Sequence, residues 1–407
     1  MLQFAPASRR QPLKRKAPMD FDFAWVLLGL PIAFVLGWLA SRFDVRQMRF
    51  ENRQAPKAYF RGLNFLLNEQ QDQAIDAFIE AVQNDPDTSE LHFALGNLFR
   101  RRGEYERAVR VHEHLLSRGD LNKADRARAQ HALALDFLKA GLLDRAEVAL
   151  RKLEGTAFES QARMALLANY ERSRDWVQAA HMAQQLQDSD QGSFRPRLAH
   201  YLCEQAVAQV GAGDLTQAAD LLRRAIETAP AAPRPRMDLS RLLVQIGNPM
   251  AAYETLAQAL ALAPVATPLF ASQLAQAAIE CNHGPQALMA LKDAYARHAS
   301  LDVLEAIVIL EATLPVLSDS PIQSARDWYV HHLEREPSLI AAAKWIAGEK
   351  LEHEQFHPQV QRALDHAVKP LTRYRCAACG FEAKQHFWQC PGCQTWDSYP
   401  ARRVEEL

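Results

Sequence analysis

The sequence has little of several residue types, and each shortage excludes a class of protein. Its 407 residues include only 6 cysteines, too few for a disulfide scaffold of this length. Neither sign of charge is in excess, because 47 Lys and Arg balance 48 Asp and Glu. Bulk nucleic-acid binding needs a basic face that displaces counterions from phosphates, so this balance argues against it. With 48% hydrophobic and 23% charged residues, the chain is expected to be globular.

The cysteines are unevenly placed. Four are clustered near the C-terminus, whereas Cys203 and Cys281 stand alone in stretches that predict helices. Isolated cysteines are usually small buried apolar residues, and we expect this of both. Two single thiols fit a reducing compartment better than an oxidising one.

One run of residues contains no charge at all. Residues 23–40 read FAWVLLGLPIAFVLGWLA, and 18 residues at about 1.5 Å each span roughly 27 Å, enough for the hydrocarbon core of a bilayer. Trp25 and Trp38 lie near its ends, where indoles settle at the membrane interface. We therefore expect a transmembrane helix over residues 20–41 and a juxtamembrane linker over residues 42–57.

Two questions about this segment stay open. A cleaved signal peptide is the alternative, but the length of the apolar run favours a retained anchor. Basic residues flank the run equally when translation starts at Met1, so they do not decide its orientation. A start at Met19 would leave only Asp20 and Asp22 in front, and the positive-inside rule would then place the bulk of the chain in the cytoplasm. We expect this orientation and treat residues 1–18 as an extension.

The body of the chain repeats with a period of 34 residues. Three positions of the stretch GLNFLLNEQQDQAIDAFIEAVQNDP recur at that spacing, as Gly62 and Gly96, Phe65 and Phe99, and Ala74 and Ala108. Together with Phe78, Ala81 and Pro86 they match the signature of a tetratricopeptide (TPR) repeat. Small residues are needed where two antiparallel helices approach closely, aromatic residues fill the gap between the helices, and proline ends the second helix.

Later units keep parts of this pattern. The alanine of the second helix is found at Ala146, Ala179, Ala218, Ala252, Ala287 and Ala325, and prolines that end helices are found at Pro230, Pro264 and Pro337. We predict an all-α TPR solenoid of about eight helix pairs over residues 58–350, with insertions near 119–124 and 188–198 and a helical linker over 351–370. Such a solenoid binds protein segments on its concave face and does not ordinarily house catalysis.

The C-terminal stretch carries a metal-ligand pattern. Two C-x-x-C pairs, Cys376 with Cys379 and Cys390 with Cys393, are separated by ten residues. They predict a small four-cysteine ribbon over residues 371–400 that holds one ion in a closed structural site. The pairs resemble rubredoxin knuckles, so zinc and iron both stay open. Redox-active disulfides are the less favoured alternative.

The ribbon has more aromatic residues than so small a module can bury. These are Phe381, Phe387, Trp388, Trp396 and Tyr399. We expect several of them to pack on the last TPR helices. The alternative is stacking on RNA bases beside the basic residues Arg373, Arg375 and Lys384. Acidic residues dilute that basic patch, namely Glu382, Asp397, Glu405 and Glu406.

One further motif resembles a catalytic site. His353, Glu354 and His357 spell H-E-x-x-H, which binds catalytic zinc when it lies on a helix. Pro358 directly follows the second histidine and disfavours helical geometry there. We therefore expect no catalytic residues and no enzyme activity.

The combination of an N-terminal span, TPR units and a terminal ribbon resembles the lipopolysaccharide assembly protein B (LapB) family of Gram-negative bacteria. The stretches that carry this resemblance are GLNFLLNEQQDQAIDAF, LGNLFRRRGEYERAVRVH, GLLDRAE, and YRCAACGF with WQCPGCQTW. The resemblance implies a single-pass inner-membrane adaptor that faces the cytoplasm and promotes degradation of the LpxC deacetylase by the FtsH protease.

The resemblance also implies further partners. Such an adaptor would limit lipopolysaccharide synthesis, gather assembly proteins at the membrane and be restrained by a lipopolysaccharide-sensing membrane protein. The alternative function is a TPR–zinc-ribbon scaffold that binds RNA or other envelope-assembly partners. A homo-oligomer is compatible with either function.

Overall fold

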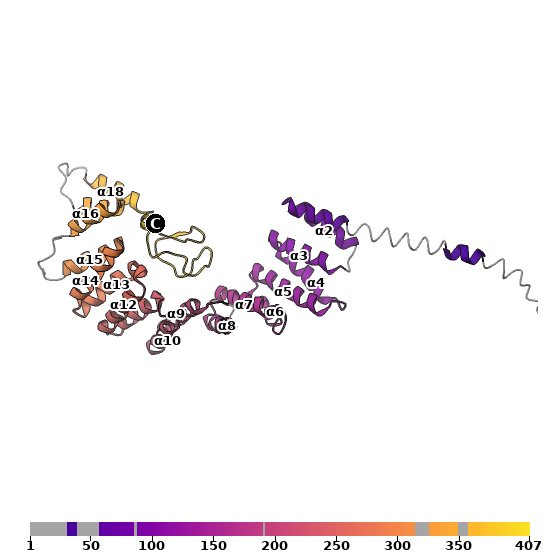
Figure 1. The fold of residues 1–407 in the computed structure, drawn as a ribbon, viewed down its shortest axis with the longest axis horizontal. Coiled ribbons are helices and arrows are strands. Elements are labelled where there is room, and N and C mark those ends of the chain that lie inside the picture. The colour runs from indigo at the N-terminus through magenta and orange to yellow at the C-terminus, as the bar shows by residue number, and fades with distance from the viewer. Residues whose placement is uncertain (1–30, 39–56, 85–87, 190–191, 314–324, 349–356) are drawn as a thin grey trace, which may run out of the picture. The chain divides into compact units, whose positions relative to one another are not determined.

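The computed structural model describes residues 31–38, 57–84, 88–189, 192–313, 325–348 and 357–407. The chain divides into two compact units, Met1–Gly141 and Leu142–Leu407. Within each unit the helices follow one another in chain order as antiparallel neighbours (Figure 1). The predicted TPR solenoid is confirmed by this architecture.

Within its described residues the first unit contains the helical segments 31–38 and 57–67 and four further helices. These are α2 (Gln71–Asn84), α3 (Ser89–Arg102), α4 (Tyr105–Ser117) and α5 (Lys123–Ala140). Ala74, Phe78 and Ala108 are fully buried in its core. The close approach predicted at the repeat glycine is present, because a Cβ on Gly62 would lie 2.9 Å from the ring of Phe78.

The second unit continues the same pairing. Its helices are α6 (Leu143–Arg151), α7 (Glu159–Ser173), α8 (Trp176–Asp188), α9 (Arg195–Ala212), α10 (Leu215–Thr228), α11 (Pro233–Gln245), α12 (Pro249–Leu262), α13 (Thr267–Glu280), α14 (Gly284–Arg297), α15 (Leu301–Thr313), α16 (Ala325–Arg335), α17 (Leu339–Ala347) and α18 (His357–Val368). A 3₁₀ turn, η1 (Pro264–Ala266), joins α12 to α13. The ribbon contributes β1 (Tyr374–Arg375), β2 (Glu382–Ala383) and the 3₁₀ turn η3 (Val404–Glu406).

Tight turns within each helix pair have a local cause. At the end of α9, Gly213 has φ +86°, a left-handed conformation that a residue without Cβ adopts at little cost. Asp214 follows, and its carboxylate accepts the backbone N–H of Gln217 at 2.8 Å, which caps α10. Asp175 and Asn248 cap α8 and α12 in the same way.

The repeat alanines are confirmed as close-packed positions. Ala146, Ala179, Ala218, Ala252 and Ala287 are at most 1% exposed. Pro230, Pro264 and Pro337 each lie just beyond a helix end, and the predicted insertions correspond to the connections from α4 to α5 and from α8 to α9. Pro86 lies outside the described residues, as does the side chain of Ala325.

The predicted anchor falls mainly outside the described residues. Of residues 20–41 only 31–38 are described, and they are helical with exposed side chains. Residues 1–18, and the linker 42–57 apart from its last residue, also lie outside them. Among the described residues no single helix is long and apolar enough to cross a membrane, although Pro249–Leu262 and Pro264–Glu280 meet that test together as a pair bent by 118°.

The two isolated cysteines differ from each other. Cys203 is fully buried as expected, and burial raises the pKa of its thiol. Cys281 is only partly buried, so the expectation of a buried apolar residue is met less well there. Its thiol lies 3.7 Å from the carbonyl oxygen of Ala278.

Candidate metal centre

Two knuckles of the same backbone geometry form the site. The amide of Cys376 donates to the carbonyl of Phe381 and that of Gly380 donates back to Cys376, both at 2.9 Å. In the second knuckle Cys390 pairs with Thr395 at 2.9 Å and Gln394 with Cys390 at 2.8 Å. Each knuckle needs a left-handed residue four positions after its first cysteine.

The sequence predicted only one of these two left-handed positions. Gly380 has φ +77°, as expected for a glycine after the second cysteine of a pair. Its counterpart is Gln394, with φ +60°, which is unusual for a residue with a side chain. Asp397 is also left-handed, and no sequence signal marked either position.

The four sulfur atoms converge as the spacing predicted. All four lie within 4.8 Å of one another, with Sγ atoms 3.8 Å apart for Cys376 and Cys393 and 3.7 Å apart for Cys379 and Cys390. A tetrahedral ion with metal–sulfur bonds of about 2.3 Å would hold its ligands about 3.8 Å apart. The donor set therefore fits one tetrahedral metal ion, and four thiolates accept either zinc or iron.

Surrounding groups favour the thiolate form that a metal requires at Cys376 and Cys393. At Cys379 the lowering of the thiol pKa by the Phe381 amide is outweighed by desolvation and by hydrogen bonds with the other cysteines, which raise that pKa. Burial opposes ionisation of Cys376, but hydrogen bonds with Ser398 and with the backbone amides of Cys379 and Ala378 lower the pKa of its thiol to about 6. The side-chain hydroxyl and backbone amide of Thr395 lower the pKa of the Cys393 thiol. These groups would stabilise negative charge on sulfur and orient the ligands.

The ribbon packs on the solenoid through its tryptophans, but not where expected. Trp396 stacks on His200 of α9 with ring centroids 4.7 Å apart and donates its indole N–H to Glu171 of α7 at 2.9 Å. Trp388 lies 5.8 Å from the same histidine ring. Trp388 also packs against the hydrophobic core that runs from Met237 of α11 to Ala341 of α17. The prediction that these aromatics pack on the last TPR helices is therefore wrong for Trp396, which contacts the middle of the second unit. The reason is that the ribbon returns to helices far earlier in the chain (Figure 1).

Polar contacts secure the same interface. Nε2 of His200 lies 2.9 Å from Asp397 of the ribbon, and its Nδ1 lies 3.3 Å from the guanidinium of Arg234. Since a guanidinium only donates, Nδ1 must accept, and Nε2–H donates to the Asp397 carboxylate. The interface thus selects one neutral tautomer of His200.

The segment after the ribbon contacts the last helices instead. Arg403 pairs with Asp302 of α15 at 2.6 Å. Glu405 accepts the backbone N–H of Leu339 at 2.6 Å, at the start of α17, and Glu406 accepts that of Leu301 at 2.6 Å, at the start of α15. The sequence showed Glu405 and Glu406 only as acidic residues near a basic patch, so their capping role was missed.

Comparison with known protein families supports both parts of the fold. Residues 374–399 match a family described as a rubredoxin metal binding domain. Residues 91–127 and 209–277 match tetratricopeptide repeat families. The predicted rubredoxin-like ribbon and the repeat are therefore confirmed.

Some curated proteins are similar to this chain over nearly its whole length, including both the solenoid and the ribbon. The chain is 28% identical over 406 residues to lipopolysaccharide assembly protein B of Escherichia coli strain K12, covering 94% of this chain and 99% of that protein. The protein of that name from Haemophilus influenzae is 25% identical, with 92% of this chain and 96% of that one covered.

Two solved structures that match this chain do so at low identity. A TPR protein from Parabacteroides merdae is 13% identical with a TM-score of 0.33, covering 63% of this chain and 98% of its own. The complex of Naa15 and Naa10 bound to HypK-THB gives 12% identity and a TM-score of 0.40, covering 78% and 48%.

The H-E-x-x-H motif lies only partly within the described residues. His353 and Glu354 lie outside the described residues. His357 begins α18, and its Nε2 lies 3.2 Å from the carbonyl oxygen of Ile346. That nitrogen is therefore engaged as a donor to backbone.

Proposed function

We propose that this chain is a membrane-anchored cytoplasmic adaptor that limits lipopolysaccharide synthesis by promoting FtsH-dependent degradation of the LpxC deacetylase. The observation that carries the proposal is the similarity to lipopolysaccharide assembly protein B along 94% of the chain, solenoid and ribbon together. A role in lipopolysaccharide assembly at the cell envelope follows from the name of those relatives. The specific partners follow from the family resemblance.

An adaptor role agrees with the physical form of the second unit. A TPR solenoid presents surfaces to protein segments, and the family name describes assembly rather than a reaction. The ribbon's four cysteines leave no ligand position for substrate or water, which supports a structural use of the metal. These features favour a protein that is not an enzyme.

The domain division and the metal ligands are part of this proposal. Residues 20–41 would anchor the chain in the inner membrane as a single span, with 58–350 forming the repeats and 371–400 the ribbon. Cys376, Cys379, Cys390 and Cys393 would ligate one ion. The anchor would raise the effective concentration of the adaptor beside a membrane protease.

The deciding experiment is capture of partners with the tagged full chain from detergent-solubilised membranes of its own organism. Recovery of LpxC and FtsH, with a longer LpxC half-life when the chain is depleted, is the expected result. A variant lacking residues 23–40 and expressed at native level should shorten the LpxC half-life less than the full chain does. Equal activity of that variant would remove tethering from the proposal.

The RNA-binding alternative is weakened by the ribbon's packing. Trp396 is 8% exposed, and Trp388 is partly buried beside His200, so neither ring is free to stack on a base. Phe381 is 44% exposed and is the aromatic residue of the ribbon most open to solvent among those described. Enrichment of RNA with neither LpxC nor FtsH would overturn the adaptor proposal.

A further inference from the structure

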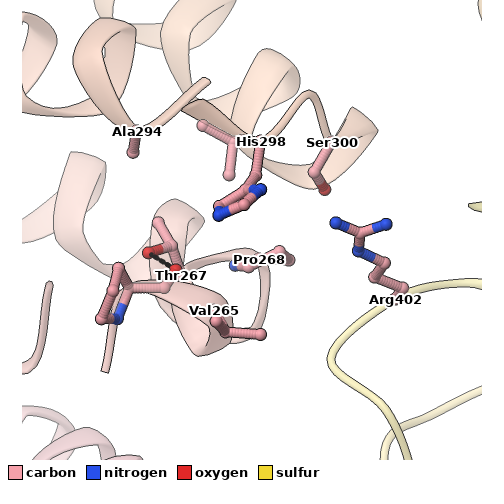
Figure 2. A pocket seen from close by; sticks show the side chains of 9 residues that line it. Val265, Thr267, Pro268, Ala294, His298, Ser300 and Arg402 are labelled. Atoms are coloured by element: carbon pink, nitrogen blue, oxygen red, sulfur yellow. Dashed lines mark hydrogen bonds between the residues drawn. The ribbon is translucent and has the colours of Figure 1, made fainter. Parts of the chain in front are cut away.

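A small cavity lies where the segment after the ribbon meets the starts of two solenoid helices. Thr267 and Pro268 line it from the start of α13, Ser300 and Val303 from the start of α15, and His298 from the end of α14. Arg402 closes it from the segment that follows the ribbon (Figure 2). All of these residues belong to the second unit.

Ser300 occupies the capping position of α15 without capping it. Its carbonyl accepts the first helical hydrogen bond, from Leu304 at 2.9 Å, which places it at the N-cap. The backbone N–H of Leu301 is instead satisfied by Glu406. The Ser300 side chain is 2% exposed, and its Oγ has no hydrogen-bond partner within the described part of the chain. Burial raises the pKa of the Glu406 carboxyl, and the nearby Ser300 hydroxyl opposes this rise. No hydrogen bond of normal geometry joins the Ser300 hydroxyl to the Glu406 carboxyl.

A buried hydroxyl without a partner is costly, so its position needs an explanation. In Figure 2 the hydroxyl of Ser300, the imidazole of His298 and the guanidinium of Arg402 face the same space. The side chains of His298 and Arg402 also have no hydrogen-bond or ion-pair partner among the described residues. Three polar groups able to donate therefore converge on one cavity.

The carboxylates nearby already have partners. Asp302 is paired with the guanidinium of Arg403 at 2.6 Å. Glu406 accepts backbone N–H groups of Leu301 at 2.6 Å and Arg403 at 3.3 Å. Arg402 has no ion-pair partner among the described residues, although Glu336, Glu405 and Glu406 line an adjacent pocket with it. Its guanidinium lies beside the start of α13, where the helix dipole is positive.

We propose that this cavity binds a phosphate-type oxyanion, with Arg402 as the charged ligand and Ser300 and His298 as hydrogen-bond donors. The cavity has a volume of about 40 Å³. That is room for about three water molecules, which suits a single phosphate group and not a nucleotide. The anion would bridge the segment after the ribbon to α14 and α15. It would thereby strengthen the docking of the ribbon on the solenoid.

The test is calorimetric titration of the full metal-loaded chain in detergent with inorganic phosphate. Phosphate should bind and raise the melting temperature. Arg402→Gln should weaken binding at least tenfold, because a charge-assisted contact is lost. Ser300→Ala should weaken it several-fold and raise the melting temperature without phosphate slightly, since this hydroxyl does not cap α15 and its burial without a partner is costly. Arg101→Gln is the matched control: it removes one positive charge from an exposed site in the other unit and should bind phosphate normally.

Vesicles that contain phosphatidic acid distinguish the source of the phosphate group. Flotation that depends on Arg402 but not on Arg101 would assign the site to a lipid headgroup, and titration with phosphate alone would assign it to a free anion. Melting curves of each variant without ligand verify that it is folded. If phosphate at about 10 mM gave no heat and the vesicles no Arg402-dependent flotation, the proposal would be overturned. An equal loss in Arg101→Gln and Arg402→Gln would overturn it as well.

Discussion

The indole of Trp396 donates to the Glu171 carboxylate across 225 residues of sequence. Trp396 also lies edge-on to Trp176 and Tyr201, with ring centroids 6.1 and 5.8 Å away. Its single side chain therefore joins the ribbon to α7, α8 and α9.

Trp396→Ala should release the ribbon from the solenoid. Removing a packed indole from a core costs about 3 kcal/mol, and the free energy of unfolding should fall by that order. Hydrogen exchange of amides 376–399 should accelerate in the folded state. Phe381→Ala, at a ring that is 44% exposed, is the control and should change stability by less than about 1 kcal/mol. Similar exchange in the two variants would contradict the assigned interface.

Metal analysis of the purified chain should find one ion per molecule. Exchanging Cys376 and Cys390 for serine should abolish binding, because two thiolates are lost from the set of four. The double variant His353→Ala, His357→Ala should retain the single ion, and Glu354→Gln should leave function unchanged. Chelation should also increase proteolysis of residues 371–400, since metal binding contributes folding energy in so small a module. A second ion that depends on His357 would revive the H-E-x-x-H site.

Glu405→Gln should destabilise the second unit through α17. The carboxylate accepts the amides of Leu339 and Ile340 at 2.6 and 3.1 Å and the hydroxyl of Ser338 at 2.8 Å. Loss of this charged cap should cost about 1 kcal/mol in chemical denaturation. Glu227→Gln makes the same chemical change at an exposed site and should have no measurable effect.

Acid should weaken the contact between α14 and α16. His332 is 2% exposed, its Nδ1 lies 2.7 Å from Tyr295 Oη, and burial lowers its pKa below the ordinary 6.5. Glu336 and Glu405 oppose this shift, whereas Arg335 and His331 add to it. The unfolded chain then binds a proton that the folded chain excludes. The stability contributed by neutral His332 is therefore present above pH about 6.5 and is lost as the pH falls below it.

The measurement for His332 is urea denaturation at a series of pH values. His332→Asn should flatten the dependence below about pH 6.5. His366→Asn, at an exposed position of α18, should leave the wild-type dependence in place. Identical pH profiles for the two variants would show that His332 does not carry the effect.

Gly96→Ala should destabilise the first unit. A Cβ there would lie 2.5 Å from the buried ring of His112, which is too close without movement of the helix pair. Overpacking of this kind costs roughly 1–3 kcal/mol. Gly211→Ala is the control, because its Cβ would meet nothing within 4 Å on α9, and it should stabilise that helix by about 0.5–1 kcal/mol.

The repeat period predicted which positions are buried in the core, but not always which type of side chain occupies them. Thirty-four residues after Phe78, the equivalent core position is His112, which is fully buried. Its Nδ1 lies 2.5 Å from buried Asp136, which also accepts from Arg100 at 2.9 Å. Sequence spacing predicts that position 112 is buried. It does not predict that a polar cluster replaces the aromatic ring there, because the cluster is formed by side chains from three different helices.

The metal ligands could be predicted from the sequence because each half of the site is formed by residues that are close together in the chain. A cysteine pair and the turn between its members lie within five residues. The position at which the ribbon packs on the solenoid could not be predicted from the sequence. His200 and Glu171 contact the ribbon only because the stacked helices between α9 and the ribbon bring them together. Small rotations at each helix pair add up along a solenoid, and no single segment encodes the sum.

The contacts of Trp396, Arg403, Glu405 and Glu406 also set an order of events during synthesis. Helices α7 to α17 leave the ribosome before these residues do. Until the ribbon follows, Glu171 lacks the indole donor of Trp396, and Glu405 and Glu406 do not yet cap the starts of α17 and α15. Closing a loop of that length is entropically costly, and domains fold as their residues emerge. Docking of the ribbon is therefore expected to be the last step of folding. Until it occurs, the exposed middle of the second unit would be open to chaperones and proteases.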